Sequence, residues 1–182
     1  MENILLKTGK IILSSPIPIS SAEELAEAAN DPHIKEMIGS HSFPYPYTKH
    51  DAVNFIEMNR MDGSKPFTID FEIRYDGSFA GVIGLRDINF TDRKAHIGYW
   101  VYEKLRRKGI ATESVKLLCE YADSKMGMHR LYTEVFTNNA GSVKVLLNSG
   151  FQIEGVARND FLYNGEYRDS FHFARIFSGK GI

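Results

Sequence analysis

Residues 105–113 read Leu105-Arg106-Arg107-Lys108-Gly109-Ile110-Ala111-Thr112-Glu113, where an alternating strand pattern gives way to a helical one. Three cations would then stand at the amino end of a helix, whose dipole already carries about half a positive charge there. That placement is unfavourable unless an anion shares the site. Gly109 lets a phosphate approach the backbone, Ala111 stays small, and the amides of the first turn can donate. The stretch predicts a pyrophosphate-binding turn; the alternative is a solvated basic run neutralised by Glu103 and Glu113.

The turn differs from two other phosphate-binding loops. A Walker loop needs G-x-x-x-x-G-K-[ST], and a dinucleotide fold needs G-x-G-x-x-G directly after a strand. Neither pattern occurs in the sequence. Kinase and Rossmann interpretations are therefore excluded.

Upstream of the turn the apolar residues alternate with period two, which is typical of half-buried strands. Such strands are predicted over 67–75, 79–88 and 94–101. Asp76-Gly77 supplies the positive φ angles of a tight turn, so these strands form an antiparallel meander. Nearer the amino terminus, after one strand, Ser21-x-x-Glu24 and Thr48-x-x-Asp51 are capping boxes that begin two helices, the second over 49–61.

Downstream of the turn, a helix is predicted from Gly109 to about Lys125, with one apolar face. A strand over 131–136, a short helix capped by Asn139 and two strands around Asn164-Gly165 complete the order. The sequence thus predicts an α/β (α+β) fold with a mixed, mostly antiparallel sheet of about seven strands flanked by about four helices.

Composition places the chain among ordinary globular domains. It has 182 residues, 43% hydrophobic and 25% charged, which suits a single domain over 1–182. A net charge of −1 offers no field for nucleic acid or an anionic membrane, so neither is an expected partner. Cys119 lies on an apolar helix face and the six histidines form no metal motif, so we expect a core cysteine and no metal. Without a signal peptide or an apolar run of membrane length, we expect a soluble, cytoplasmic protein.

The turn and its surroundings resemble a known family. Arg106-x-x-Gly109-x-Ala111 matches the (Q/R)-x-x-G-x-(G/A) signature of the GNAT superfamily of N-acetyltransferases, whose turn amides hold the pyrophosphate of acetyl-CoA. Four further motifs resemble the RimJ/RimL branch, which acetylates protein amino termini and various small amines. They are His96-Ile-Gly-Tyr-Trp-Val101, Asn139-x-x-Ser142, Gly150-Phe151 and the stretch from Arg158 to Asp169. The resemblance implies a GNAT-type fold and acetyl-CoA as the cosubstrate, over about 67–177.

The resemblance also implies which residues contact acetyl-CoA. The turn would bind its phosphates, backbone groups near Trp100 and Val101 would pair with its pantetheine arm, and Asn139 would serve both as helix cap and as pantetheine partner. The full expected set is Trp100, Val101, Arg106, Arg107, Lys108, Gly109, Ile110, Ala111, Thr112, Asn139 and Ser142.

Acetyl transfer to an amine needs a proton acceptor and a proton donor for the departing thiolate. His96 occupies the position where several GNAT enzymes carry a catalytic glutamate, and an imidazole can accept a proton at neutral pH. The alternatives are a strand histidine that only bonds a neighbour, a water chain, and Glu72 on the polar face of its strand, a face that is expected to be wet. Leu146 stands where many members have a tyrosine acid, so Ser142 is the expected substitute, with an ordinary helix serine as the alternative.

The acceptor is left open by the sequence. Protein amino termini, a polyamine and an amino-acid-like amine all fit, and Asp70, Glu72 and Asp87 could form an acidic wall for a cation. The Pro-rich aromatic stretch 41–47 is expected to wall the acceptor cleft or to pack in the core. A non-catalytic acyl-CoA sensor is the rival function, and exposed strand ends leave room for a homodimer.

Overall fold

The computed structural model describes residues 3–39, 43–61 and 67–178. Its centre is one eight-stranded sheet with the order β1-β2-β3-β4-β5-β6-β8-β7, in which the β5–β6 pair is parallel and the other pairs are antiparallel. The strands are β1 (Ile4–Thr8), β2 (Ile11–Ser15), β3 (Phe67–Tyr75), β4 (Ser78–Asn89), β5 (Lys94–Val101), β6 (Arg130–Phe136), β7 (Gln152–Tyr163) and β8 (Glu166–Ile176). The helices are α1 (Ala22–Ala29), α2 (Pro32–Ile38), α3 (Lys49–Met61), α4 (Ile110–Ser124) and α5 (Ala140–Asn148), with short 3-10 turns at Ile19–Ser21 and Glu103–Leu105.

The mixed, mostly antiparallel fold is confirmed, but the predicted numbers of strands and helices are each one too low for the described residues. The amino-terminal strand is a hairpin, because Gly9 takes a φ of +52° and folds β1 back on β2. The extra helix is α2, which starts at Pro32 after Asp31 accepts the His33 amide. Asp-Pro is a helix-start signal, but α2 has only 7 residues and little periodicity by which to recognise it.

Most predicted local signals are found, with one exception. Thr48 and Asp51 exchange the two bonds of a capping box, and Asn139 accepts the Ser142 amide at 3.1 Å. Ser21, in contrast, makes no capping bond, so that capping box is wrong. Its hydroxyl donates instead to Glu72 at 2.6 Å, because a buried carboxylate from β3 competes successfully for it.

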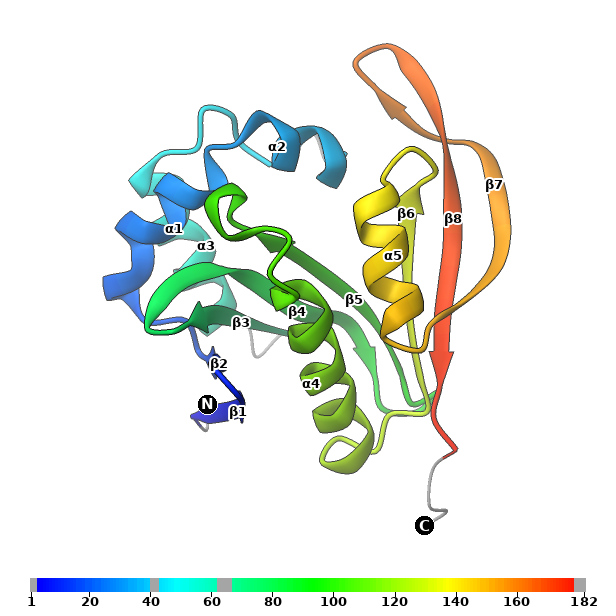
Figure 1. Ribbon diagram of the computed structural model, residues 1–182, viewed down its shortest axis with the longest axis horizontal. Helices are drawn as coiled ribbons and strands as arrows, with labels where there is room; N and C mark the ends of the chain where they lie inside the picture. The colour runs from blue at the N-terminus through cyan, green and yellow to red at the C-terminus, as the bar shows by residue number, and fades with distance from the viewer. Residues whose placement is uncertain (1–2, 40–42, 62–66, 179–182) are drawn as a thin grey trace.

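Helices cover both faces of the sheet, as Figure 1 shows. The face under α4 and α5 holds the larger apolar cluster, which includes Phe71, Ile83 and Ile97. The face under α1 and α3 holds a smaller cluster, which includes Phe79 and Val82. Cys119 is buried in the larger cluster, which confirms the predicted core position, and burial raises the pKa of its thiol to about 11. No helix among the described residues is long and apolar enough to cross a membrane.

The sheet divides between β5 and β6. These two strands pair only over Lys94–His96 and Arg130–Tyr132, and beyond that point they splay apart (Figure 1). Parallel neighbours that separate leave unpaired backbone groups along both strands. The opening therefore lies beside the carboxyl-terminal halves of β5 and β6.

Helix α2 spans the mouth of this opening. At its start, the Asp31 carboxylate binds the guanidinium of Arg106, next to the end of β5. At its other end, Glu36 lies 3.3 Å from Arg168 of β8, and Gly39 packs so closely on the ring of Phe136 of β6 that a Cβ would lie 2.3 Å from it. The helix thus connects the two separated halves of the sheet.

Candidate functional site

Two cavities meet in the opening between β5 and β6. The first, which we call the phosphate-turn cavity, has a volume of about 610 Å³ and is lined by α2, the end of β5, the turn before α4, and α5. The second, which we call the His96 cavity, has a volume of about 660 Å³ and lies against β4, β5, β6 and α3. Met37, Ile38, Tyr99, Trp100, Asn139 and Ser142 line both.

The phosphate-turn cavity ends at the amino terminus of α4. Gly109 caps this helix with a φ of +79°, and Arg107 also takes a positive φ, of +63°. The first cap bond runs from the Glu113 amide to the Gly109 carbonyl at 3.0 Å, so the amides of residues 110–112 precede the helical bonding pattern. Ile110, Ala111 and Thr112 line the cavity beside these amides. The local geometry is that of an anion-binding helix terminus with backbone donors.

The three cations of the turn point in different directions. Arg106 donates to the Val101 carbonyl at 3.1 Å and to Asp31, so its side chain fastens the turn to β5 and α2. Arg107 is exposed and lines the cavity. Lys108 does not line it; its ammonium lies 6.0 Å from the centre of the Tyr75 ring. Arg107 is thus the turn cation best placed for a phosphate.

The wall shared by the two cavities is fixed by hydrogen bonds. The Tyr99 hydroxyl donates to the Ser142 carbonyl at 3.4 Å, and the Ser142 amide donates to the Asn139 side chain. Burial raises the pKa of Tyr99 well above its usual range, so its phenol stays protonated. The predicted proton donor Ser142 and the predicted pantetheine partners Trp100 and Asn139 therefore meet at one place.

The floor of the His96 cavity is one face of the β4–β5 pair. Three cross-strand pairs form it in sequence: Val82 with Trp100, Gly84 with Gly98, and Arg86 with His96. A Cβ at Gly98 would meet nothing within 4 Å, so the middle of the floor is open. Gly84 has no such room, because a Cβ there would lie 2.0 Å from the Asp70 carboxylate. The glycine pair therefore separates two ends of the cavity floor: an aromatic end at Trp100 and a charged end at Arg86 and His96.

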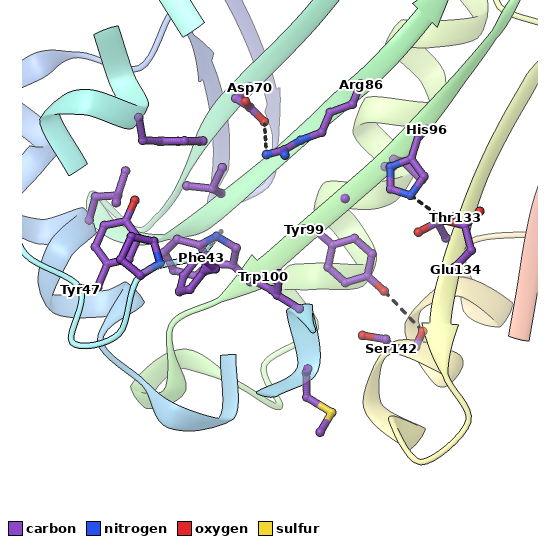
Figure 2. A pocket seen from close by; sticks show the side chains of 18 of the residues that line it. Phe43, Tyr47, Asp70, Arg86, His96, Tyr99, Trp100, Thr133, Glu134 and Ser142 are labelled. Atoms are coloured by element: carbon purple, nitrogen blue, oxygen red, sulfur yellow. Dashed lines mark hydrogen bonds and ion pairs between the residues drawn. The ribbon is translucent and has the colours of Figure 1, made fainter. Parts of the chain in front are cut away.

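His96 and Glu134 are bonded at the charged end, where β5 and β6 begin to separate. The His96 Nε2 atom lies 3.1 Å from the Glu134 carboxylate, and both side chains are half-buried (Figure 2). The bond to His96 lowers the pKa of Glu134 despite the opposing effect of burial. Both interpretations of His96 are therefore compatible with the geometry: it bonds a neighbour and also faces the cavity.

Asp70 and Arg86 form the second charged group, which Figure 2 shows beside His96. Their closest atoms lie 3.7 Å apart. The Asp70 side chain is 2% exposed, whereas that of Arg86 is 53% exposed. Arg86 therefore covers a buried carboxylate and presents its own charge to the cavity.

Glu72 lies outside both cavities. Its carboxylate accepts from the hydroxyls of Ser14 at 2.9 Å and Ser21 at 2.6 Å, and lies 3.4 Å from Arg74. The expectation of a wet face at Asp70 and Glu72 is wrong, since both residues are buried. The reason is that the amino-terminal helices cover this face of β3; hydrogen bonds then satisfy the Glu72 carboxylate, and Arg86 lies against that of Asp70.

Aromatic side chains form the far wall of the His96 cavity. Phe43 and Tyr47, whose ring centres lie 5.0 Å apart, join Phe55 and Trp100 there. Burial raises the pKa of Tyr47 to about 12, so it stays a neutral phenol. Phe43, Pro44 and Tyr47 of the predicted aromatic wall thus line the cavity, whereas His41 and Ser42 lie outside the described residues. Asp87, expected in an acidic wall, does not line the cavity.

Residues 11–152 match the acetyltransferase (GNAT) domain family. The chain belongs to this family. Its resemblance to the RimJ/RimL branch is supported by the ribosomal-protein-serine acetyltransferase of Escherichia coli (strain K12), which is 25% identical over 133 residues, 73% of this chain and 74% of that protein.

Two further GNAT-family comparisons differ in coverage. Spermidine N(1)-acetyltransferase of Escherichia coli (strain K12) is 30% identical over 100 residues, 55% of this chain and 54% of that protein. The chain thus spans about half the length of that relative. The crystal structure of the microcin C7 self immunity acetyltransferase MccE, in complex with acetyl-CoA and AMP, superposes with a TM-score of 0.82 at 27% identity, over 93% of this chain and 94% of that one.

Most of the site residues expected from the GNAT resemblance line the two joined cavities, together with several residues that were not expected. His96, Trp100, Ser142 and the α4 turn all line the joined cavities, whereas Glu72 and Lys108 do not. Sequence reasoning missed four groups of cavity residues. They are Glu134, Arg86, Phe55 and the α2 pair Met37 and Ile38. Period-two alternation placed Arg86 on the face of Gly84, but no local signal says that this face opens on a cavity.

Among the described residues, no group of three or more His, Cys, Asp or Glu side chains could hold a metal ion. Each carboxylate that lines the His96 cavity lies close to a hydroxyl, imidazole or guanidinium group. Asp51 bonds Thr48, Glu134 bonds His96, and Asp70 lies under Arg86. The polar chemistry of the site is therefore that of hydrogen bonds and ion pairs.

Proposed function

We propose that this protein transfers an acetyl group from acetyl-CoA to a primary amine, as an acyltransferase of the GNAT family. The observation that carries the proposal is the junction of the two cavities at Tyr99, Trp100, Asn139 and Ser142. One cavity ends at an anion-binding helix terminus, and the other contains a histidine that can accept a proton. A donor and an acceptor bound side by side can react directly in a ternary complex.

The donor side of the proposal uses mostly main-chain groups. The amides of residues 110–112 and the side chain of Arg107 would hold the pyrophosphate, since both face the phosphate-turn cavity. Arg106, which also borders this cavity, would mainly hold the turn in place, because two of its donors bond Val101 and Asp31. Backbone groups near Trp100 and Val101, with Asn139, would hold the pantetheine arm.

The chemistry would be a direct transfer. The amine nitrogen attacks the thioester carbonyl carbon, the new C–N bond forms, and the C–S bond breaks as the thiolate leaves. His96, held by Glu134, would take the proton from the amine, directly or through water. Ser142, at the junction, would donate to the thiolate, with water as the alternative. Glu72 is the weaker candidate base, because its carboxylate is occupied outside the cavity.

A base at His96 has a direct test. His96→Ala should lower kcat/KM by about 10²-fold or more and flatten the acidic limb of its pH profile, which is the usual scale for loss of general-base catalysis. An unchanged pH profile would assign the proton to water.

The working context of the enzyme is part of the proposal. We treat residues 1–182 as one acetyltransferase domain in the cytoplasm, acting as a homodimer. Support for the dimer comes from β7, which is the last strand of the sheet and carries exposed apolar side chains, among them Val156, Leu162 and Ile153. Cell fractionation checks the location, and light scattering checks the dimer.

The acceptor class cannot be taken over from the relatives, since their names include ribosomal proteins and spermidine. Protein amino termini and small amines are both proposed at this level. Intact-mass measurement of acetylated products would separate a protein acceptor from a small one.

The first experiment is thermal unfolding with acetyl-CoA, with CoA and with ATP. At about 100-fold over Kd a ligand adds ~2.7 kcal/mol, which raises Tm by roughly 5 to 10 °C for a chain of this size. We expect this rise with acetyl-CoA and CoA and little with ATP. A second assay follows free thiol after amines are added. Binding without thiol release from any amine would identify a non-catalytic acyl-CoA sensor and contradict the proposal.

A further inference from the structure

The charged end of the His96 cavity carries both signs of charge side by side. Arg86 is the one Lys or Arg residue among the described residues that line this cavity. It stands directly opposite His96 in the β4–β5 ladder, where Cβ atoms are ~5 Å apart. A cation that faces a cavity beside a candidate base is not needed for the transfer itself, so it requires another explanation.

The guanidinium of Arg86 has donors to spare. Its ion pair joins one guanidinium nitrogen to Asp70 at 3.7 Å, and more than half of its side chain is exposed. Arginine carries five N–H donors in a fork that matches a carboxylate. The ladder is also interrupted here: Asp87 takes a φ of +50°, and the register shifts between Arg86 and Asn89 before pairing resumes at Asn89 and Lys94. Such irregularities change the direction of neighbouring side chains, and Arg86 is the last regularly paired residue before this one.

The carboxylates of the cavity argue against a polyamine. A polyamine presents several ammonium groups and needs several carboxylates that are not already engaged. Glu134 is bonded to His96, Asp51 to Thr48, and Asp70 is buried beneath Arg86. A ligand with one positive and one negative group fits this arrangement better, because each charge then has a partner of opposite sign nearby.

The rest of the floor indicates the body of the ligand. Successive same-face positions along a strand are ~7 Å apart, so the open floor at Gly98 follows the charged pair and the Trp100 position follows Gly98. Phe43 and Tyr47 stand at the aromatic end with Trp100 (Figure 2). A side chain that starts near His96 and crosses Gly98 would reach these rings.

We propose that the acceptor is a free α-amino acid with a large apolar side chain. Its carboxylate binds Arg86, its amine lies beside His96, and its side chain crosses Gly98 toward the aromatic wall. The inference rests on the proposed acetyltransferase function and specifies its substrate class. In the transfer, the α-ammonium first gives one proton to the base, and the neutral nitrogen then forms the bond to the acetyl carbon. The C–S bond of the thioester breaks, and the second proton lost by the nitrogen balances the protonation of the departing thiolate to the thiol.

The test compares acceptors that differ only in the carboxylate. We would measure kcat/KM for L-phenylalanine, L-phenylalaninamide and spermidine with the unmodified protein and with Arg86→Gln. Loss of a charged hydrogen-bond partner typically lowers kcat/KM by about 10- to 100-fold. We expect this loss for L-phenylalanine with Arg86→Gln, and a change of less than about 3-fold for the amide, which lacks the negative charge. Lys125→Gln, which also removes an exposed positive charge but lies outside both cavities, is the control and should change neither.

Three results of this comparison would overturn the inference while leaving the acetyltransferase function intact. They are equal rates with phenylalanine and its amide, faster transfer to spermidine, or an unchanged rate for phenylalanine in Arg86→Gln. A fourth acceptor, a peptide amide with an amino-terminal aspartate, tests whether the end of a protein supplies the carboxylate. A higher kcat/KM for this peptide than for L-phenylalanine would also overturn the proposal of a free amino acid. A Tm rise with acetyl-CoA in Arg86→Gln shows that the variant is folded. If acetyl-CoA causes no Tm rise even in the unmodified protein, the proposed function itself fails, and this inference with it.

Discussion

Arg106 and Arg107 are neighbours in the chain, but their side chains have different surroundings. Arg106 is bonded to the Val101 carbonyl and to the buried Asp31, whereas Arg107 is exposed at the phosphate-turn cavity. The family signature includes Arg106, yet in this fold its side chain holds the turn to β5 and α2. Stability and ligand binding should therefore depend on different arginines.

Arg106→Gln should lower the free energy of unfolding by ~1–3 kcal/mol, because a buried partner loses a charged hydrogen bond. For a chain of this length that is a Tm decrease of roughly 3 to 10 °C. Arg107→Gln is the matched variant: we expect an unchanged Tm without ligand and a weaker Kd for acetyl-CoA. Thermal unfolding and calorimetric titration measure the two effects. The reverse pattern would assign the phosphate contact to Arg106.

Glu134 gives a pH-dependent prediction. Its pKa is lowered in the folded protein, chiefly by the bond to His96 and further by the charges of His96 and His172, so the ionised form stabilises the fold. That stabilisation is complete above the ordinary carboxylate value of 4.5 and is lost as pH falls through the lower folded pKa. Glu134→Gln should therefore reduce Tm at pH 7 and converge with the unmodified protein below pH 4.5. A Tm difference that stays constant through this acid range would contradict the ion pair.

At the scale of elements, the β4–β5 pair shows how one strand ladder can hold two glycines for different reasons. At Gly84 the missing Cβ makes room for the Asp70 carboxylate, and at Gly98 it leaves cavity volume open. The two residues face each other in register. Their substitution should consequently affect different properties of the protein.

Gly84→Ala should destabilise the fold by ~1–3 kcal/mol, since its Cβ would overlap a buried side chain and lie 2.9 Å from the Ile69 carbonyl. Gly98→Ala should leave stability unchanged or raise it by about 0.5–1 kcal/mol, as alanine suits a strand better than glycine. Gly98→Leu should keep the fold but reduce kcat/KM for bulky acceptors more than for small ones. Denaturant titration and acceptor kinetics check these outcomes. Equal destabilisation by both alanines would show that Gly98 is not open.

Local patterns predicted the elements that carry their own signals. Alternation located β3, β4 and β5, and the positive φ angles at Asp76, Gly77, Asn164 and Gly165 match their predicted turns. Partners distant in sequence were not predictable in this way. Ser21 has the local form of a helix cap, yet it bonds Glu72, which lies 51 residues away. The burial of Glu72 itself depends on helices that pack against β3 only in the folded chain.

At the scale of the whole molecule, the site depends on where the sheet divides. The residues of the α4 turn could be recognised from sequence because their function uses consecutive backbone amides. Glu134 and Arg86 could not, because they meet His96 only through the pairing of three strands. His41 and Ser42 of the predicted aromatic wall lie outside the part of the chain that the structure describes.

The two ends of the sheet give a prediction about assembly. Val156 on β7 is 55% exposed, and Leu5 on β1, the strand at the opposite edge, is 57% exposed. If the β7 edge joins two copies, Val156→Lys should give a monomer by light scattering, while Leu5→Lys should stay dimeric. A monomer for the unmodified protein at micromolar concentration would rule out this dimer.

Helix α2 has a consequence for the order of binding. It is fastened at one end to the phosphate turn and at the other to β6 and β8, and its residues Met37 and Ile38 border both cavities. A ligand that steadies the turn also steadies α2, and with it the wall that the second ligand contacts. Free-energy coupling of this kind is reciprocal, so each ligand should tighten the binding of the other by the same factor. Weakening the fastening with Asp31→Asn should therefore lower this cooperativity, although Asp31 borders neither cavity.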